Sequence, residues 1–198
     1  MDSEQNIDDW VNLPQTADTL YLWDTLHDGY LLSIESDLLL RTITFQFEVN
    51  YVREFHQLAE DTRFVITVFD VQSVRSLRYA LWPGGCRASA DLSYEESSRL
   101  KAEYQEKWRE ESWSWGEFEL EAGDQPYVSN AVLARGAESI ALLLEFGSEG
   151  GSCSRAYVRG RTIKFSIGKK EVTPEEFVAA GEAYWSDWSD SSKRASSN

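Results

Sequence analysis

One of the two histidines in this 198-residue chain, His27, stands directly before Asp28 and Gly29. A histidine beside a carboxylate suits two kinds of chemistry, because the pair can bind a metal ion or transfer protons. Metal-dependent phosphohydrolases of the His-Asp type need several further histidines on helices, and this chain offers only His56. The same residues suit the entry to a strand, where an aspartate bonds backbone N–H groups and a glycine takes a positive φ. We therefore predict a structural role at strand entry for His27, Asp28 and Gly29.

The two cysteines are poor candidates for chemistry. Cys86 precedes Arg87, and a nearby arginine favours the thiolate. A cysteine nucleophile also needs a base, and nothing in the sequence places a histidine beside Cys86. Two cysteines do not make a disulfide framework in a chain of this length. The spacing leaves open whether Cys86 and Cys153 meet, and we predict two reduced thiols.

Other catalytic patterns are missing from the sequence. It contains no glycine-rich phosphate loop after a strand and no G-x-S-x-G, and no spacing singles out a carboxylate pair for glycoside hydrolysis. We expect no catalytic metal and no cofactor, and the sequence favours a non-catalytic protein. The alternative is a small-molecule or carbohydrate binder or hydrolase with a cleft lined by carboxylates and by Trp82, Trp113 and Trp115.

The charge of the chain narrows the choice of partner. It has 34 acidic and 19 basic residues, a formal net charge of −15, which repels nucleic acid but suits a basic protein. The segment 95–124 is rich in acidic residues and tryptophan, and is interpreted either as a solvated helix face or as a surface that recognises a basic partner. Under the second interpretation the partner-binding residues are Glu106, Glu110, Glu111, Trp113 and Trp115.

Alternation of apolar and polar residues predicts strands that carry one buried and one wet face. The predicted strand segments are 30–35, 42–49, 63–71, 74–82, 127–134, 139–146, 155–160 and 161–167. The segment 63–71 is apolar nearly throughout and is therefore expected to be more central in the sheet. A short break at Ser36 and Asp37 predicts a hairpin, and the segment 74–82 either continues the strand before it or pairs with it.

Two segments change to a helical period. A capping box of Ser93 and Glu96 predicts one long surface helix near 93–112. Thr173, Pro174 and Glu176 open a short C-terminal helix at about 173–185. Phe177, Ala180, Tyr184 and Trp188 lie along one side of it.

The order of strands, helix, strands and helix predicts an α+β fold with a mostly antiparallel β-sheet, for which strong curvature or a second layer is an open alternative. We expect a single domain over 10–188, a loose N-terminus over 1–9 and a disordered tail over 189–198. The N-terminus shows no signal peptide, and no apolar run has the length of a membrane helix. We therefore expect a cytoplasmic protein that does not contact membranes.

The segment from Trp23 to Val49 resembles the opening of some small bacterial domains of unknown function. In those domains an aromatic residue, then His-Asp and a small residue, lead into a strand and a second strand of R-T-[IV]-T type, here Arg41 to Thr44. Some relatives of that type are similar to immunity proteins of polymorphic toxin systems. The resemblance implies an α+β fold and a non-enzymatic binding protein, and it carries over no site residues.

Overall fold

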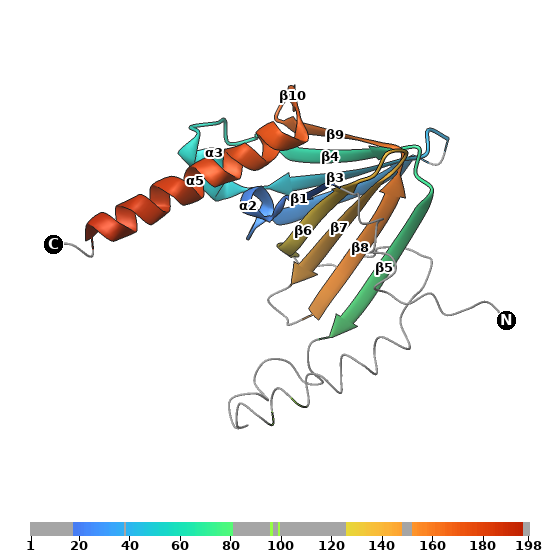
Figure 1. Ribbon diagram of the computed structural model, residues 1–198, viewed down its shortest axis with the longest axis horizontal. Coiled ribbons are helices and arrows are strands. Elements are labelled where there is room, and N and C mark those ends of the chain that lie inside the picture. The colour runs from blue at the N-terminus through green and yellow to red at the C-terminus, as the bar shows by residue number, and fades with distance from the viewer. Residues whose placement is uncertain are drawn as a thin grey trace.

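A computed structural model of the chain describes residues 18–37, 39–80, 126–147 and 152–195, together with the helical residues Glu96 and Arg99. Figure 1 shows that the described strands form a bent sheet with helices gathered at one end. The elements are β1 (Asp18–Tyr21), α2 (Trp23–Leu26), β2 (Tyr30–Asp37), β3 (Thr42–Glu48), α3 (Asn50–Phe55), β4 (Phe64–Phe69), β5 (Ser73–Ala80), β6 (Tyr127–Arg135), β7 (Ile140–Gly147), β8 (Ser152–Gly160), β9 (Thr162–Ile167), β10 (Lys170–Val172) and α5 (Pro174–Ala195).

The sheet has 10 strands, and every described pairing in it is antiparallel. The order is β10-β9-β4-β3-β2-β6-β7-β8-β5, and β1 pairs with β6 beside this path. The predicted α+β class with a mostly antiparallel sheet is therefore confirmed.

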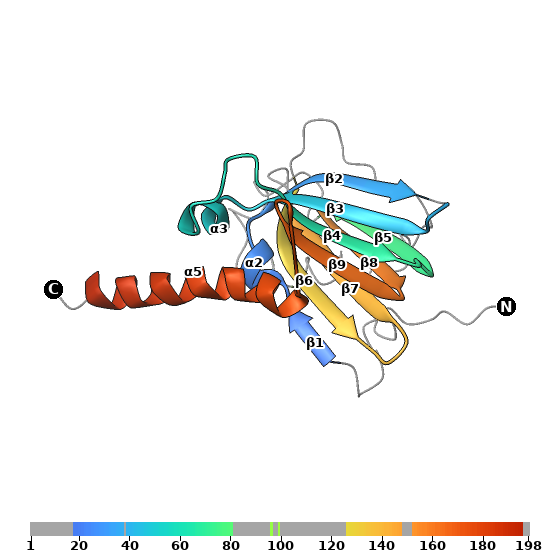
Figure 2. The same cartoon turned by 90° about the horizontal axis from the view of Figure 1, so that it is seen from above.

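The sheet divides into two halves at its centre. β2 and β6 are joined by a single residue pair, Tyr30 with Tyr127. The chain crosses between the halves again at the opposite corner, from β4 to β5 and from β8 to β9. There the Arg161 N–H donates to Phe69 O at 3.0 Å and the Gln72 N–H donates to Arg159 O at 2.8 Å. The sheet therefore bends so that both halves face one interior (Figure 2).

Both halves contribute to one hydrophobic core. β3 buries Phe45 and Phe47, whereas the intervening Gln46 is only partly covered, as the alternation predicts. β7 does the same with Leu142 and Leu144. These side chains belong to a single buried cluster. Burying side chains of this kind stabilises a fold by about 1.5–3 kcal/mol each.

The structure corrects details of the predicted strands. The hairpin between β2 and β3 is present, but Asp37 ends β2, and its Oδ1 accepts hydrogen bonds from Leu39 N and Leu40 N, both at 2.9 Å. β5 pairs along its whole length with β8 rather than with β4, because the chain crosses to the other half of the sheet after Phe69. The short strands β1 and β10 were not predicted, since three or four residues are too few to show a period.

The helices differ more from the prediction. α2 and α3 were missed because each is only a turn or so long. α5 begins as predicted, with Glu176 N donating to Thr173 Oγ1 at 3.1 Å and Thr173 N donating to Glu176 Oε2 at 2.8 Å. It ends at Ala195, not near residue 185, so residues 189–195 of the expected disordered tail are helical. Once the first turns are anchored, extending a helix costs far less than starting one.

The predicted long helix over 93–112 lies outside the described residues except for Glu96 and Arg99, which are helical and exposed. The predicted loose N-terminus, residues 1–9, lies outside them as well.

Candidate interaction surface

The segment His27–Gly29 forms the turn between α2 and β2. Asp28 has a φ of 54°, a left-handed conformation that aspartate tolerates better than most residues. The sequence predicted a positive φ at Gly29 instead. The glycine is required for a different reason, since a Cβ there would lie 2.9 Å from Leu26 O and 3.0 Å from Val49 Cγ2. The structure thus places the three residues at the entry to β2.

The surroundings of His27 are aromatic. Its ring lies 4.3 Å from that of Trp23 and 5.7 Å from that of Trp185. Its Nδ1 stands 3.4 Å from Asp28 Oδ2 but is buried without a hydrogen-bond partner. Over the described ranges, no three His, Cys, Asp or Glu side chains gather in a way that could hold a metal ion. Here the histidine contributes aromatic packing.

His27 belongs to an aromatic junction that joins α2, α3 and α5. We define this junction by five residues, which are Trp23, His27, Tyr51, Tyr184 and Trp185. Trp185 is central, with ring centroids 6.0 Å from Trp23, 5.5 Å from Tyr51 and 5.0 Å from Tyr184. Aromatic pairs at such distances contribute about 0.5–1.5 kcal/mol each beyond the area they bury. The junction therefore holds the middle of α5 against the two short helices.

Hydrogen bonds fix the junction further. The carbonyl oxygen of Asp24 accepts from Trp185 Nε1 at 2.8 Å and from the Tyr51 hydroxyl at 3.0 Å. Burial raises the pKa of Tyr51 above its usual range, and the negative charges of Asp28 and Asp24 add to the shift. The Tyr51 hydroxyl therefore keeps its proton and donates it in the hydrogen bond. The carboxylates of Asp24 and Asp28 add negative charge near the junction.

α2 and α5 meet almost backbone to backbone. The buried hydroxyl of Thr25 donates to Phe177 O at 2.6 Å and accepts from Gly181 N at 3.2 Å. A Cβ at Gly181 would lie only 2.0 Å from Asp24 O. Only a glycine allows this approach, which sets the direction in which α5 leaves the body.

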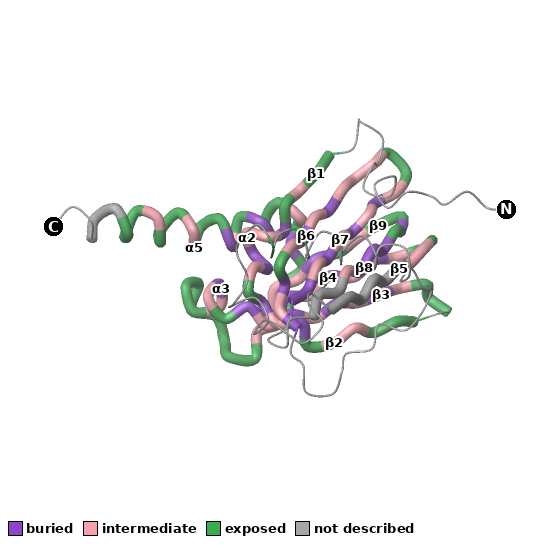
Figure 3. Tube along the Cα trace, turned by 90° about the horizontal axis from the view of Figure 1, so that it is seen from below, coloured by how far each residue is buried: buried purple, intermediate pink, exposed green. Residues whose placement is uncertain are grey.

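The apolar stripe of α5 continues past the part of the helix that the body covers. Phe177 and Gly181 are buried, Tyr184 and Trp185 are half-buried, and Trp188 follows on the same side. Trp188 is 56% exposed, and its ring stands edge-on to Trp185 at 6.2 Å. Beyond Trp185 the helix is largely exposed and projects from the sheet (Figures 1 and 3). We call residues 186–195 the overhang.

Exposed carboxylates lie along α5 and beside the junction. Glu182, Asp187 and Asp190 are exposed on α5, and Asp28 is exposed beside the junction. No lysine or arginine occurs between Lys170 and Lys193. Trp188 therefore has aspartates near it in sequence, and the helix carries Lys193 and Arg194 before it ends at Ala195.

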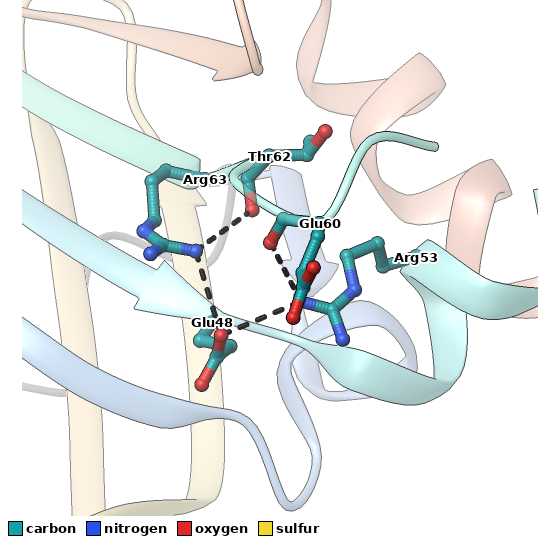
Figure 4. A network of polar contacts seen from close by, with 5 residues as sticks. All are labelled: Glu48, Arg53, Glu60, Thr62 and Arg63. Carbon is teal, nitrogen blue, oxygen red and sulfur yellow. Dashed lines mark hydrogen bonds and ion pairs between the residues drawn. The ribbon is translucent and has the colours of Figure 1, made fainter. Parts of the chain in front are cut away.

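Several described arginines are engaged within the body. Arg53 and Arg63 each place Nη1 3.4 Å from Glu48 Oε1, and Arg53 Nη1 also donates to Glu60 O at 2.7 Å (Figure 4). This cluster ties β3 to α3 and to the start of β4. Arg135 holds Asp18 of β1 and Glu175 of α5. Arg41 donates to Val71 O at 2.8 Å. These cations hold elements of the fold together.

The partner-binding residues predicted from the sequence, Glu106, Glu110, Glu111, Trp113 and Trp115, lie outside the described residues, as do Trp82 and Cys86. The sequence pointed to Trp188 as part of the helix stripe, but the helix was expected to stop before it. If the helical period is continued for one more turn, Trp188 becomes the exposed residue of the stripe.

Comparison with protein-family models, with curated proteins and with solved structures finds no match for this chain. Among the described residues, no helix has both the length and the apolar character that a membrane crossing requires. Function is therefore inferred from the surface of the molecule itself.

Proposed function

We propose that the protein is a non-catalytic interaction domain that binds a basic protein partner, in the manner of an immunity protein. The observation that carries the proposal is the exposed indole of Trp188, which stands against the hydrogen-bonded aromatic junction. Tryptophan is enriched among the residues that dominate binding energy, and a rigid position lowers the entropy lost on binding.

The net charge supports the same proposal. At −15 the molecule attracts positively charged partners over distances of the order of the Debye length, about 10 Å at 0.1 M salt. Arg53, Arg63 and Arg135 pair with carboxylates of the same chain, and the excess of acidic over basic residues remains. Electrostatic attraction of this kind mainly raises the association rate.

The resemblance of residues 23–49 to small bacterial domains of unknown function, some relatives of which are similar to immunity proteins, supports a binding role in place of a catalytic one. The acidic segment with Glu106, Glu110, Glu111, Trp113 and Trp115 is the second surface that we propose for partner contact, on the ground of its composition alone.

The test is capture of partners from a lysate of the source cell with the full chain as bait, followed by binding kinetics at several salt concentrations. We expect a basic partner whose association slows as salt rises, because screening shortens the reach of the field. Reversing Glu106, Glu110 and Glu111 to lysine should slow association without unfolding the protein.

Two results would contradict the proposal. One is an acidic partner, or a partner whose association rate ignores both salt and charge reversal. The other is the absence of a partner together with a sugar or metabolite that raises the melting temperature. That second result would favour the small-molecule or carbohydrate binder or hydrolase.

A further inference from the structure

We propose that the basic partner adds an extended segment to the sheet, as a new strand beside residues 33–37 of β2. This inference rests on the proposed function and deepens it by naming where the partner binds and in what conformation. The site lies on the sheet and not on the overhang of α5. In the described part of the chain, residues 33–37 pair with β3 on one side, and no strand pairs with them on the other. We call this second side the unpaired edge.

The first step of the argument is the point where the two halves of the sheet separate. β2 meets β6 at its start, where Tyr30 pairs with Tyr127. The N–H of Leu31 donates to Pro126 O at 2.8 Å, and the two strands then part. Figures 2 and 3 both show β2 as the outermost strand of its half of the sheet.

The chain itself fills the edge of β6 that faces this separation. β1 pairs with residues 132–135, and Leu22 N donates to Ala131 O at 2.9 Å. Val128 N donates to Gly29 O at 2.8 Å. Among the described residues β2 has no such cover, and its exposure agrees. None of its last five residues is fully buried, whereas β3 beside it buries every second residue.

The second step is the direction of the backbone groups along β2. Arg41 O accepts a 2.9 Å hydrogen bond from the chain just after β4, so the backbone groups of Arg41 face β4. These groups alternate in direction along a strand, so those of Thr42 face β2, where Thr42 pairs with Asp37. Counted back from Asp37, the same alternation turns the N–H and C=O groups of Ser36 and Ile34 away from β3. The unpaired edge therefore offers two donors and two acceptors.

The third step is the class of occupant. An extended polypeptide carries N–H and C=O groups at the spacing of a strand edge, and main-chain hydrogen bonds supply the affinity when a strand is added. A second copy of the chain is disfavoured. Antiparallel pairing of two β2 edges would set the carboxylates of Glu35 and Asp37 against those of the other copy, and like charges directly opposite each other destabilise a strand pair.

The same carboxylates favour a basic segment. Glu35 and Asp37 are exposed on one face of β2, which contains no lysine or arginine. Both accept hydrogen bonds from uncharged N–H groups, which leave their negative charge in place. Arg41 follows at the tip, but its guanidinium donates to Val71 O after β4, about 10 Å from β2 at the usual strand spacing. Lysine or arginine at alternate positions of the added strand would stand beside the two carboxylates.

The probe is an end-capped peptide of alternating valine and lysine, titrated into the full chain at low salt. Valine favours an extended strand, and the alternation places every lysine on one face, as β2 places Glu35 and Asp37. One control peptide has the same composition in two blocks, which removes the alternation. The other has glutamate in place of lysine. The readouts are the dissociation constant and amide hydrogen exchange, followed residue by residue by NMR.

We expect the amides of Ile34 and Ser36 to exchange fast in the free chain, and the amide of Glu35, which faces β3, to exchange slowly. The alternating peptide should protect Ile34 and Ser36 and bind more tightly than either control peptide. This pattern of protection identifies the strand to which the peptide is added.

Two variants at one position isolate the backbone contact. Ser36→Pro removes an N–H that faces the unpaired edge, and an edge strand tolerates proline at such a position. It should weaken binding by roughly two- to tenfold, as loss of one hydrogen bond does. Ser36→Ala keeps the N–H and should bind within about twofold of the unchanged chain. Slow exchange of the β3 amides in Ser36→Pro checks that the sheet is intact.

A second pair of variants tests charge. Glu35→Lys should weaken binding of the lysine peptide and strengthen binding of the glutamate peptide, because the cross-strand charge pair is reversed. Glu138→Lys makes the same change in net charge at an exposed site beyond the far end of β6, and should alter both affinities less.

The inference is overturned if the amides of Ile34 and Ser36 are already protected in the free chain, since the chain would then cover this edge itself. It is also overturned if the alternating peptide does not bind, if it leaves these amides unprotected, or if Ser36→Pro with an intact β3 binds as well as Ser36→Ala. A captured basic partner with salt-dependent association that tolerates both Ser36→Pro and Glu35→Lys would leave the proposed function standing and reject this site alone.

Discussion

At the scale of the residue, the buried side-chain hydroxyl of Thr25 holds α2 against α5. Thr25 is the one buried polar or charged residue among those described, and its hydroxyl contacts three backbone groups of α5, namely Phe177 O, Val178 O and Gly181 N. A buried hydrogen bond of this kind stabilises a fold only modestly, whereas a buried group that loses its partner costs about 1–3 kcal/mol.

We predict that Thr25→Val lowers the free energy of unfolding by about 1–3 kcal/mol, because Phe177 O and Gly181 N lose a partner inside the protein. Thr25→Ser keeps the hydroxyl and should cost less. Urea denaturation of both variants measures the difference. A larger loss in Thr25→Ser than in Thr25→Val would mean that the methyl group, not the hydroxyl, matters at this position.

Sequence reasoning at this scale predicted where residues lie better than what they contact. His27, Asp28 and Gly29 stand at the strand entry as the turn chemistry of these residue types predicts. The positive φ is at Asp28, and Gly29 is required instead because a Cβ there would lie against Leu26 O and Val49 Cγ2. Contacts between segments distant in sequence, such as Trp23 with Trp185, have no local signal.

At the scale of the element, α5 is the feature that needs most explanation. It has 22 residues, which gives a length of about 33 Å, and only its first half packs on the body. The composition of 189–198 predicted disorder because nothing there buries apolar surface. The helix continues from an anchored first half, and such continuation cannot be deduced from the composition of the tail alone.

We predict that Gly181→Ala destabilises the protein even though alanine favours a helix by about 0.8–1 kcal/mol over glycine. The added Cβ would stand 2.0 Å from Asp24 O, so α2 and α5 must separate and the bonds of Thr25 and Trp185 must lengthen. A fall of more than about 2 kcal/mol in unfolding free energy is expected. Ala183→Gly, at an exposed site of the same helix, gives the propensity effect alone and should cost about 1 kcal/mol. Stabilisation by Gly181→Ala would show that the helices do not touch here.

The ion pair between Arg135 and Glu175 makes the stability of the first turn of α5 depend on pH. A hydrogen bond from Arg135, at 2.5 Å, holds the pKa of Glu175 below its usual value. A lowered pKa in the folded state gives stability above the unfolded pKa, about 4.3, and this stability is lost as the pH falls through the folded value. The pair is exposed, so its contribution should stay below about 1 kcal/mol.

Glu175→Gln should therefore destabilise the protein slightly at neutral pH and make no difference below the folded pKa. Glu138→Gln, which removes an exposed carboxylate at the β6–β7 turn, corrects for the general loss of one negative charge. Urea midpoints across the acidic range provide the measurement. A Glu175→Gln effect that is constant with pH would refute the ion pair as its source.

At the scale of the whole molecule, the alternating runs predicted most strands and the antiparallel class correctly. They did not predict that β5 pairs with β8 across the crossing from one half to the other. Periodicity indicates which side of a strand is buried. It does not indicate which other strand pairs with its edge. Periodicity also could not predict the candidate surface. The exposure of Trp188 depends on where along α5 the helix stops packing on the rest of the protein, and no local sequence pattern contains that information.

The net charge of −15 leads to a prediction about the whole fold. Folding brings the excess carboxylates closer together than they are in the unfolded chain, so their repulsion opposes the compact state. Sodium chloride screens this repulsion, and the Debye length falls from about 30 Å at 0.01 M to about 3 Å at 1 M. We therefore expect the urea midpoint at neutral pH to rise as salt is added over this range. Near the isoelectric point, pH 4.5, the same salt should give little or no rise, because the excess charge is gone. An equal rise of the urea midpoint at both pH values would mean that salting-out of apolar surface, not charge, causes the effect. A fall at neutral pH would mean that favourable ion pairs such as Arg135 with Glu175 outweigh the repulsion.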